Sequence, residues 1–149
     1  VELDGKILLL LGFGRIGRRV AELAKAFGMT VVAFDPYIAD ERFTALRVRR
    51  AASLDALIGE SNILTMHVPL NDETRGMVDS RLLGRMRKGS MLVNTARGAV
   101  VDEAALVEAL GRGVPAGARI PTQDTASKSA SPCSIKVGTS GSELLRLEA

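Results

Sequence analysis

Short apolar runs alternate along the chain with longer segments in which apolar residues recur every three or four positions. The first run, 6–11 (KILLLL), is stopped by a glycine, and a second, 30–34 (TVVAF), is rich in β-branched residues. Both are typical of strands that are buried on both faces of a sheet. Between them the apolar residues from Arg15 to Phe27 follow helical spacing, and Gly28 predicts the end of that helix.

The same alternation continues further along the sequence. Apolar runs at 63–68 (ILTMHV) and 90–95 (SMLVNT) predict two more strands, and Pro69 predicts the end of the first. Three amphipathic segments follow a residue that can cap a helix, namely Leu57–Ile58 after Ser53, Leu82–Met86 after Asp79 or Ser80, and Leu106–Leu110 after Asp102 and before Gly111. Strands that alternate with helices predict an α/β fold with a parallel sheet.

The character of the chain changes near residue 114. From Val114 to Ala149 there are six serines, no aromatic residue and a net charge of only +1, from four basic and three acidic side chains. Only the last eight residues, SELLRLEA, have a helical pattern. We therefore predict one domain at 1–118 and a divergent serine-rich tail at 119–149, as loop or disordered chain with a short C-terminal helix.

Composition narrows the class of protein. A chain of 149 residues, 46% hydrophobic and 25% charged, is long enough for one globular core. The net charge is +3, but the basic residues are scattered apart from Arg47, Arg49 and Arg50, which we interpret as a solvated surface and not a nucleic-acid site. No apolar run is long enough for a membrane span, and we predict no metal site. The single cysteine, Cys133, excludes an internal disulfide and favours a cytoplasmic location.

A glycine-rich segment follows the first predicted strand and opens the first predicted helix. In LLLLGFGRIGRRV, residues Gly12, Gly14 and Gly17 have the spacing G-x-G-x-x-G. These glycines allow a tight turn, a close approach of the backbone to a pyrophosphate, and close packing of helix on sheet, while the helix N-terminus attracts the phosphates. A turn without a ligand is the alternative. The order strand, turn, helix favours a dinucleotide site on a Rossmann-type doubly wound sheet with helices on both faces.

An acidic residue follows the second predicted strand. Asp35 stands 18 residues beyond Gly17, where dinucleotide-binding folds place an acid that accepts hydrogen bonds from the adenosine ribose. A carboxylate repels a 2′-phosphate, and the next residues are Pro36 and Tyr37, with no arginine. A turn residue before proline is the alternative function for Asp35. We predict NAD and not NADP as the cofactor.

An arginine stands where a buried strand is expected to end. In MLVNTARGAVVDE (91–103), an apolar run gives way to a polar turn and then to Arg97. Open α/β sheets bind ligands at the carboxyl ends of their strands, and a guanidinium can hold a carboxylate with two hydrogen bonds. A surface arginine paired with Asp102 or Glu103 is the alternative, and spacing alone favours it.

Three stretches together resemble one enzyme family. They are ELDGKILLLLGFGRIGRRVAELAKAFGMTVVAFDPY, ILTMHVPLNDETRGMV and MRKGSMLVNTARGAVVDEAALVEAL, and they span residues 2 to 113. In this order they are similar to the D-isomer-specific 2-hydroxyacid dehydrogenases, the family of phosphoglycerate dehydrogenase and hydroxypyruvate reductase. The block VNTARG-VVDE with HVPLN-ET upstream carries most of the specificity, because a glycine motif alone is common to many dinucleotide-binding proteins.

The resemblance implies a role for individual residues. Arg97 would be catalytic, since the arginine of this block lies beside the nicotinamide, binds the substrate carboxylate and polarises the carbonyl that receives hydride. The other residues implied in cofactor binding are Arg15 and Ile16 at the pyrophosphate, Val68, Pro69 and Thr74 along the adenosine and nicotinamide-ribose side, and Thr95 and Ala96 through their backbone.

The resemblance also implies groups that this sequence does not show. The family uses a downstream histidine, held charged by a glutamate, to move the hydroxyl proton. The only histidine here is His67, which we expect to pack or hydrogen-bond near the cofactor and not to donate a proton. After Ala118 the family runs on with Leu-Asp-Val-Phe and an acidic Glu-Pro segment, which are missing. We therefore expect a sheet truncated at its C-terminal end, and whether the chain is an enzyme stays open.

Two functions follow from these expectations. The first is an NAD(H)-binding domain of an oxidoreductase that acts on the CH–OH group of a small 2-hydroxy acid and transfers a hydride between NAD and a 2-hydroxy or 2-oxo acid. The alternative is a non-catalytic NAD-binding or dimerisation module. The resemblance implies a homodimer through the NAD-binding domain, which is compatible with both.

Overall fold

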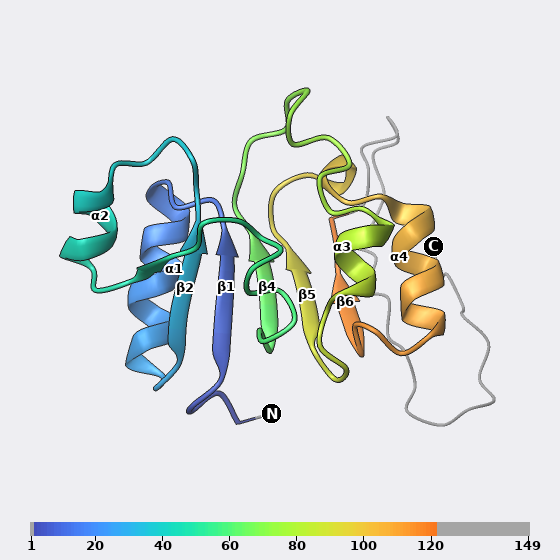
Figure 1. The fold of residues 1–149 in the computed structure, drawn as a ribbon, viewed down its shortest axis with the longest axis horizontal. Helices are drawn as coiled ribbons and strands as arrows, with labels where there is room; N and C mark the ends of the chain where they lie inside the picture. Colours follow the sequence, from blue (N-terminus) through green and yellow to red (C-terminus); the bar gives the residue numbers. More distant parts are fainter. Residues whose placement is uncertain (1, 122–149) are drawn as a thin grey trace, which may run out of the picture.

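A single parallel sheet organises the part of the chain that the computed structural model describes, residues 2–121 (Figure 1). Within those residues the sheet has six strands in the order β3-β2-β1-β4-β5-β6, and every pair is parallel. The strands are β1 (Ile7–Leu11), β2 (Thr30–Phe34), β3 (Arg49–Arg50), β4 (Ile63–Met66), β5 (Met91–Asn94) and β6 (Gly117–Arg119). The helices are α1 (Arg15–Ala26), α2 (Asp40–Ala45), α3 (Ser80–Gly84), the 3-10 helix η1 (Gly98–Val100) and α4 (Glu103–Gly111).

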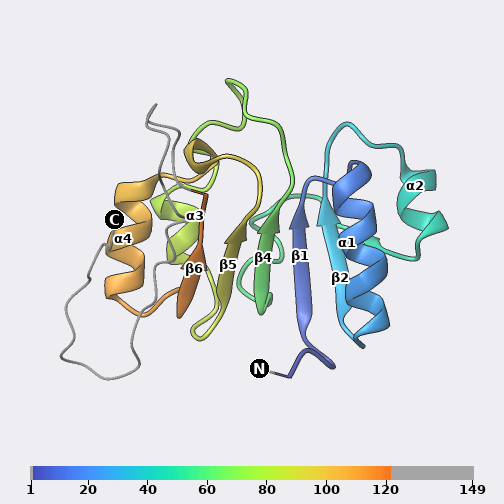
Figure 2. The same ribbon diagram turned by 180° about the vertical axis from the view of Figure 1, so that it is seen from behind.

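Helices cover both faces of the sheet, which confirms the predicted doubly wound architecture. Alternate residues of a strand point to opposite faces, so Leu8 and Leu10 of β1 enter one core cluster with α1 and α2, whereas Leu9 and Leu11 enter a second cluster with α3 and α4. Figures 1 and 2 show α1 and α2 near the β2 end of the sheet and α3 and α4 near the β6 end. Because β1 contributes to both clusters, it is buried on both faces, as its apolar sequence predicts.

Most predicted elements form with nearly the expected bounds. The strand at 30–34 is unchanged, the helix from Arg15 ends one residue before the expected Phe27, and Asp79 and Asp102 cap α3 and α4. The predicted strand at 63–68 is too long. It stops at Met66, where β1 and β5 on either side also end; the next residue, His67, still donates its N–H to the Leu11 carbonyl.

The predicted helix after Ser53 is wrong: residues 55–60 form successive turns. The Ser53 hydroxyl accepts a hydrogen bond from the Ala56 N–H at 3.3 Å, and the Ile58 N–H reaches the Leu54 carbonyl at 3.1 Å, so one helical turn begins. The segment is too short to extend it, since few hydrogen bonds offset the cost of starting a helix. Its apolar side chains Leu54 and Ile58 are nevertheless buried in the core.

Four elements have no counterpart in the predictions, namely α2, β3, η1 and β6. The strand β3 consists of two exposed arginines, Arg49 and Arg50, of the cluster that we interpreted as a solvated surface. Arg50 also pairs with Asp40 and lies 5.2 Å from the ring centre of Phe43, so this arginine holds α2 against the sheet edge. Of the predicted tail at 119–149, residues 122–149 lie outside the described part.

The register of the sheet places the functional segments at one level. Leu11 of β1 pairs with Phe34 of β2 and Met66 of β4, and Met66 pairs with Asn94 of β5. The residues that follow these four strand ends are Gly12, Asp35, His67 and Thr95. Parallel strands that end in register therefore bring four segments, far apart in the sequence, to one edge of the sheet.

Candidate functional site

The glycine turn is closely packed on its inner side and open on its outer side. Gly12 has a φ of +95°, and a Cβ atom there would lie 2.8 Å from the carbonyl oxygen of His67. A Cβ on Gly17 would lie 2.3 Å from the carbonyl oxygen of Gly12, so neither position accepts a side chain without movement. At Gly14, by contrast, an added Cβ would meet no described atom within 4 Å. The backbone at Gly14 is thus accessible to a ligand.

The N-terminus of α1 is suited to an anion. Gly14 is its N-cap and supplies no capping side chain, and the first turn has no acidic residue. The N–H groups of such a turn have no acceptor within the helix and carry the positive end of its dipole. Together with the open backbone at Gly14, this helix end fits a pyrophosphate.

Asp35 joins the end of β2 to the glycine turn. One carboxylate oxygen accepts a hydrogen bond from the Phe13 N–H at 2.8 Å, and the other accepts one from the Tyr37 N–H at 3.0 Å. Each carboxylate oxygen can accept a further hydrogen bond, since an ionised carboxylate has about four acceptor positions. The acid is therefore fixed in place and still able to bind ribose hydroxyls, which fits the adenosine half of a dinucleotide.

The loop after β4 is held by Thr74. Its hydroxyl donates to the Pro69 carbonyl at 2.6 Å and accepts from the Asn71 N–H at 2.9 Å, and the side chain is buried. Thr74 does not line the pocket described below. The structure thus places Thr74 behind Pro69, where it shapes the loop and does not face the pocket.

The turn after β5 is shaped by Asn94, which the sequence analysis did not select. Its buried side chain accepts a hydrogen bond from the Ala96 N–H at 2.9 Å and donates to the Arg97 carbonyl at 2.7 Å. These two bonds hold the backbone at the start of Ala96 and at the end of Arg97, so the conformation of both residues is fixed. An asparagine at a predicted strand end was the available signal, because Asn side chains commonly bond the backbone of a following turn.

Arg97 itself extends from this turn with its charge exposed. Its Nη1 donates to the Ala96 carbonyl at 3.2 Å, and it forms no ion pair among the residues that the structure describes. Asp102, one of the two acids weighed as its partner, instead caps α4 by accepting from the Ala105 N–H at 3.0 Å. The guanidinium is available for an anionic ligand.

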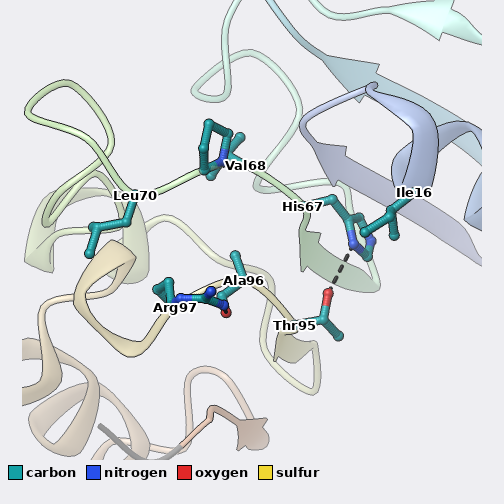
Figure 3. Close-up of a pocket in the computed structure, with 8 residues that line it drawn as sticks. Ile16, His67, Val68, Leu70, Thr95, Ala96 and Arg97 are labelled. Carbon is teal, nitrogen blue, oxygen red and sulfur yellow. Dashed lines mark hydrogen bonds between the residues drawn. The ribbon is translucent and has the colours of Figure 1, made fainter. Parts of the chain in front are cut away.

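These segments enclose a pocket at the carboxyl edge of the sheet (Figure 3). It has a volume of about 410 Å³ and is lined by Ile16, His67, Val68, Pro69, Leu70, Thr95, Ala96 and Arg97. Six of the predicted site residues therefore meet here: Ile16, Val68, Pro69, Thr95, Ala96 and Arg97. The lining combines apolar side chains with one guanidinium, a composition suited to an uncharged ring next to a carboxylate.

His67 lies in this pocket with both ring nitrogens engaged. Nε2 is 3.1 Å from the Thr65 hydroxyl, and Nδ1 is 2.9 Å from the Thr95 hydroxyl. Burial lowers the pKa of the imidazole below its ordinary value, so the ring is neutral at pH 7. A neutral ring with both nitrogens occupied is poorly placed to transfer a proton to a substrate.

A side-chain hydrogen bond near Asp35 joins two loops of the site. The Tyr37 hydroxyl donates to the Glu73 carboxylate and links the loop after β2 to the loop after β4. That hydrogen bond and the charge of Glu73 raise the pKa of the Tyr37 phenol, and the nearby Asp35 adds to the effect. Neither residue was selected from the sequence, because nothing in the spacing of 37 and 73 indicates that they meet.

Comparison with known proteins gives one family and many relatives. The family model described as D-isomer specific 2-hydroxyacid dehydrogenase, NAD binding domain, matches residues 1–130. D-3-phosphoglycerate dehydrogenase of Bacillus subtilis is 43% identical over 119 residues, which are 80% of this chain and 22% of that protein. Glyoxylate reductase of Aeropyrum pernix is 47% identical over 123 residues, which are 80% of this chain and 36% of that protein.

The chain is also similar to solved structures. D-lactate dehydrogenase from Aquifex aeolicus, in complex with NAD and lactic acid, matches with a TM-score of 0.77 and 36% identity, over 84% of this chain and 37% of that one. The chain thus spans well under half the length of the relatives that it matches. None of the helices in residues 2–121 is long and apolar enough to cross a membrane.

Proposed function

The chain belongs to the D-isomer specific 2-hydroxyacid dehydrogenases and contains the NAD-binding domain of that family, and on this premise we propose that it serves hydride transfer between NAD and a small 2-hydroxy or 2-oxo acid. One observation carries the proposal. Ile16 at the start of α1, Pro69 after β4 and Arg97 after β5 line a single pocket, so the end of the cofactor site and a free guanidinium share one space. A hydride transfer needs that proximity.

The residues that would hold NAD divide by the part of the cofactor that they suit. The open backbone at Gly14 and the first turn of α1, with Arg15 and Ile16, would bind the pyrophosphate. Asp35 would accept the ribose hydroxyls and disfavour the 2′-phosphate of NADP. When bound, NAD supplies a carbon that accepts or releases hydride.

Arg97 would bind the substrate carboxylate and polarise its carbonyl. A guanidinium offers paired donors that match a carboxylate, and it keeps its charge at any working pH. The Asn94 hydrogen bonds fix the turn that carries it, which limits the freedom lost when substrate binds. Among residues 2–121, Arg97 is the one candidate for a group that touches the reacting atoms.

The alternative is a non-catalytic NAD-binding and dimerisation module, and a feature of α1 favours self-association. Leu23 of this helix and Phe27, which follows the helix as its C-cap, are 48% and 63% exposed. Large exposed apolar side chains on one helix face are typical of an interface. We therefore include a homodimer through this domain in the proposal, for the catalytic and the non-catalytic function alike.

We also propose a cytoplasmic location. The sequence has one cysteine and so forms no internal disulfide, as is usual for proteins of a reducing compartment. Separation of the cytoplasmic from the other cell fractions, followed by detection of the chain with an antibody, tests this part of the proposal.

Ligand binding to the purified chain tests the main proposal. The chain has no tryptophan, so the fluorescence of NADH reports its binding without interference from the protein. NADH should bind, and oxalate, a stable mimic of a 2-oxo acid, should bind to the NADH complex. Glyoxylate and pyruvate would then test for oxidation of NADH.

Two variants give the test its specificity. Arg97→Ala should leave NADH affinity within about threefold but weaken oxalate binding at least about tenfold, because a charge-assisted pair is lost. Arg87→Ala is the matched control, since Arg87 is exposed and precedes β5, at the opposite edge of the sheet. Absence of NADH binding would contradict the cofactor site, and equal oxalate binding by all three proteins would contradict the role of Arg97.

A further inference from the structure

The histidine in the pocket connects segments that the proposed function uses separately. His67 is the only histidine of the chain and directly follows β4. Its side chain lies between two threonines, Thr65 within β4 and Thr95 directly after β5. Thr65 is only 5% exposed, so one side of the ring is anchored in the interior of the sheet.

The hydrogen bonds around the ring have a direction that the acceptors determine. The Thr95 hydroxyl donates its single proton to the Met66 carbonyl at 2.9 Å, because a carbonyl can only accept. The Thr95 oxygen must then accept from His67, so the proton of the ring is on Nδ1. In a neutral ring Nε2 has no proton, and it accepts the hydroxyl proton of Thr65.

The backbone of the same residue is in contact with the glycine turn. The His67 N–H donates to the Leu11 carbonyl at 2.7 Å, one residue before Gly12. A side chain on Gly12 would collide with the His67 carbonyl, and a Cβ on Gly17 would lie 4.0 Å from the His67 Cβ. His67 therefore packs against the glycine turn through its backbone, and it is bonded to the segment before Arg97 through its ring.

We propose that His67 is a positioning residue, which in its Nδ1–H form fixes the Thr95–Arg97 segment relative to the glycine turn. The inference rests on the proposed function, since that segment is proposed to bind the substrate and that turn the cofactor. The ring donates no proton to the substrate. It acts through Thr95, whose hydroxyl is held by Nδ1–H on one side and by the Met66 carbonyl on the other. The spacing between cofactor and guanidinium then depends on one imidazole.

The tautomer can be measured without any ligand. Because the chain has a single histidine, nitrogen NMR of the protein labelled with ¹⁵N-histidine gives one pair of ring signals. At neutral pH we expect a protonated Nδ1 and an unprotonated Nε2. A proton on Nε2, a charged ring, or a ring that averages freely between the two tautomers would overturn the proposal.

The positioning role is tested by variants that keep or remove the donor. In His67→Asn the side-chain amide can replace Nδ1–H, whereas His67→Leu keeps bulk and donates nothing. The oxalate affinity of the NADH complex should fall about tenfold in His67→Leu and should stay within about threefold of wild type in His67→Asn. The affinity for NADH itself should change less in both variants. The same split is expected between Thr95→Val and Thr95→Ser.

The outcomes separate this inference from the proposed function. If the wild-type chain binds no NADH, the proposed function fails, and the tautomer measurement still decides the geometry at His67. If NADH and oxalate bind but His67→Leu leaves oxalate affinity unchanged, the positioning role is wrong. If His67→Asn and His67→Leu lose oxalate binding equally, the hydrogen bond to Thr95 is not the cause, which also contradicts the proposal.

Discussion

Asp35 combines a structural and a binding role in one carboxylate. It holds Phe13 and Tyr37 by their N–H groups, and it would also accept the ribose hydroxyls. In Asp35→Asn the charge is lost, and the amide has only one oxygen for two N–H groups. We expect the ratio of NADH to NADPH affinity to fall about tenfold and the free energy of unfolding to fall by about 1 kcal/mol.

Titrations with NADH and NADPH together with urea unfolding measure both effects. Glu60→Gln is the control, because Glu60 is an exposed acid that precedes β4 at the opposite edge of the sheet. An unchanged affinity ratio in Asp35→Asn would contradict the assignment of Asp35 to the ribose.

His67 should give the protein a pH-dependent stability. Burial lowers the pKa of its imidazole in the folded state, so the unfolded chain takes up the proton first as the pH falls below about 6.5. Stability from this group is complete above that pH, and it is lost between it and the lower pKa of the folded protein. We expect the free energy of unfolding to decrease as the pH falls below about 6.5, and to decrease less in His67→Asn. If urea unfolding shows the same dependence of the free energy of unfolding on pH for wild type and His67→Asn, this assignment is wrong.

Tyr37 offers a direct readout of the contact between the two loops beside Asp35. It is the only tyrosine, and the chain has no tryptophan, so an ultraviolet titration reports this phenol alone. Since the hydrogen bond to Glu73 and the charge of Glu73 raise the pKa of Tyr37, Glu73→Gln should lower that pKa toward its ordinary value. Asp72→Asn removes a charge one residue away and should have a smaller effect. Equal titrations of wild type and Glu73→Gln would show that the contact is not formed in solution.

The candidate site shows which residues a sequence can identify. Gly12 and Gly17 are identifiable from their spacing, and contacts exclude any side chain there, whereas Arg97 is identifiable from the block VNTARG that resembles the dehydrogenase family. Asn94 and Thr74 act by bonding the backbone of their own loops, and short polar residues are too common in turns for this to be a specific signal. The role of the His67 ring depends on its hydrogen bond to Thr95, 28 residues away in the sequence. Nothing in the spacing of the two residues indicates this contact, so it could be found only in the structure.

Two helices begin with aspartates whose contribution can be measured. The Asp79 side chain accepts from the Leu82 N–H at 2.8 Å, and the Asp102 side chain accepts from the Ala105 N–H at 3.0 Å. Asp102→Ala should lower the free energy of unfolding by about 1 kcal/mol, because an N–H at the helix start loses its acceptor. Asp102→Ser, which keeps an acceptor, should recover most of the loss in urea unfolding. Equal stability of the alanine and serine variants would contradict the capping role.

Among the helices and strands, those with a clear pattern in their own residues could be predicted from the sequence. The strands β1 and β2 are apolar because both of their faces are buried, and Asp102 marks the start of α4. The strand β3 has only Arg49 and Arg50, and an arginine pair has no strand pattern. It pairs with Val32 and Ala33 of β2 because α2 returns the chain to that edge, with Arg50 bonded to Asp40. Such an element is determined by its neighbours in space.

At the scale of the whole molecule, the order of the strands explains why the site lies where it does. The connection after β1 leads to β2 on one side, and the chain crosses to the other side of β1 to form β4. Ligands of open α/β sheets bind outside the carboxyl ends of the strands at such a reversal. Gly12 and His67 follow β1 and β4 directly, so the reversal brings the glycine turn into contact with the residue that holds the Arg97 segment.

The outer surface of α1 leads to a final prediction about assembly. Three residues of this helix, Gly17, Ala21 and Ala24, are small and buried against the sheet, whereas Leu23 and Phe27 are exposed. Large apolar side chains directed away from the core cost solubility unless a partner covers them. We expect a dimer in sedimentation velocity, and a shift toward monomer in the double variant Leu23→Ser and Phe27→Ser.

The control for this prediction comes from another helix. Val107 of α4 is 44% exposed, similar to Leu23, but α4 packs on the other core cluster. Val107→Ser should therefore leave the dimer intact. A wild-type chain that stays monomeric over the whole accessible concentration range would contradict the interface, as would equal weakening by the α1 and α4 substitutions. Because Leu23 and Phe27 lie near the end of α1 that is away from Gly14, and do not line the pocket, the monomeric variant should still bind NADH. Assembly and cofactor binding would then be independent properties of this domain.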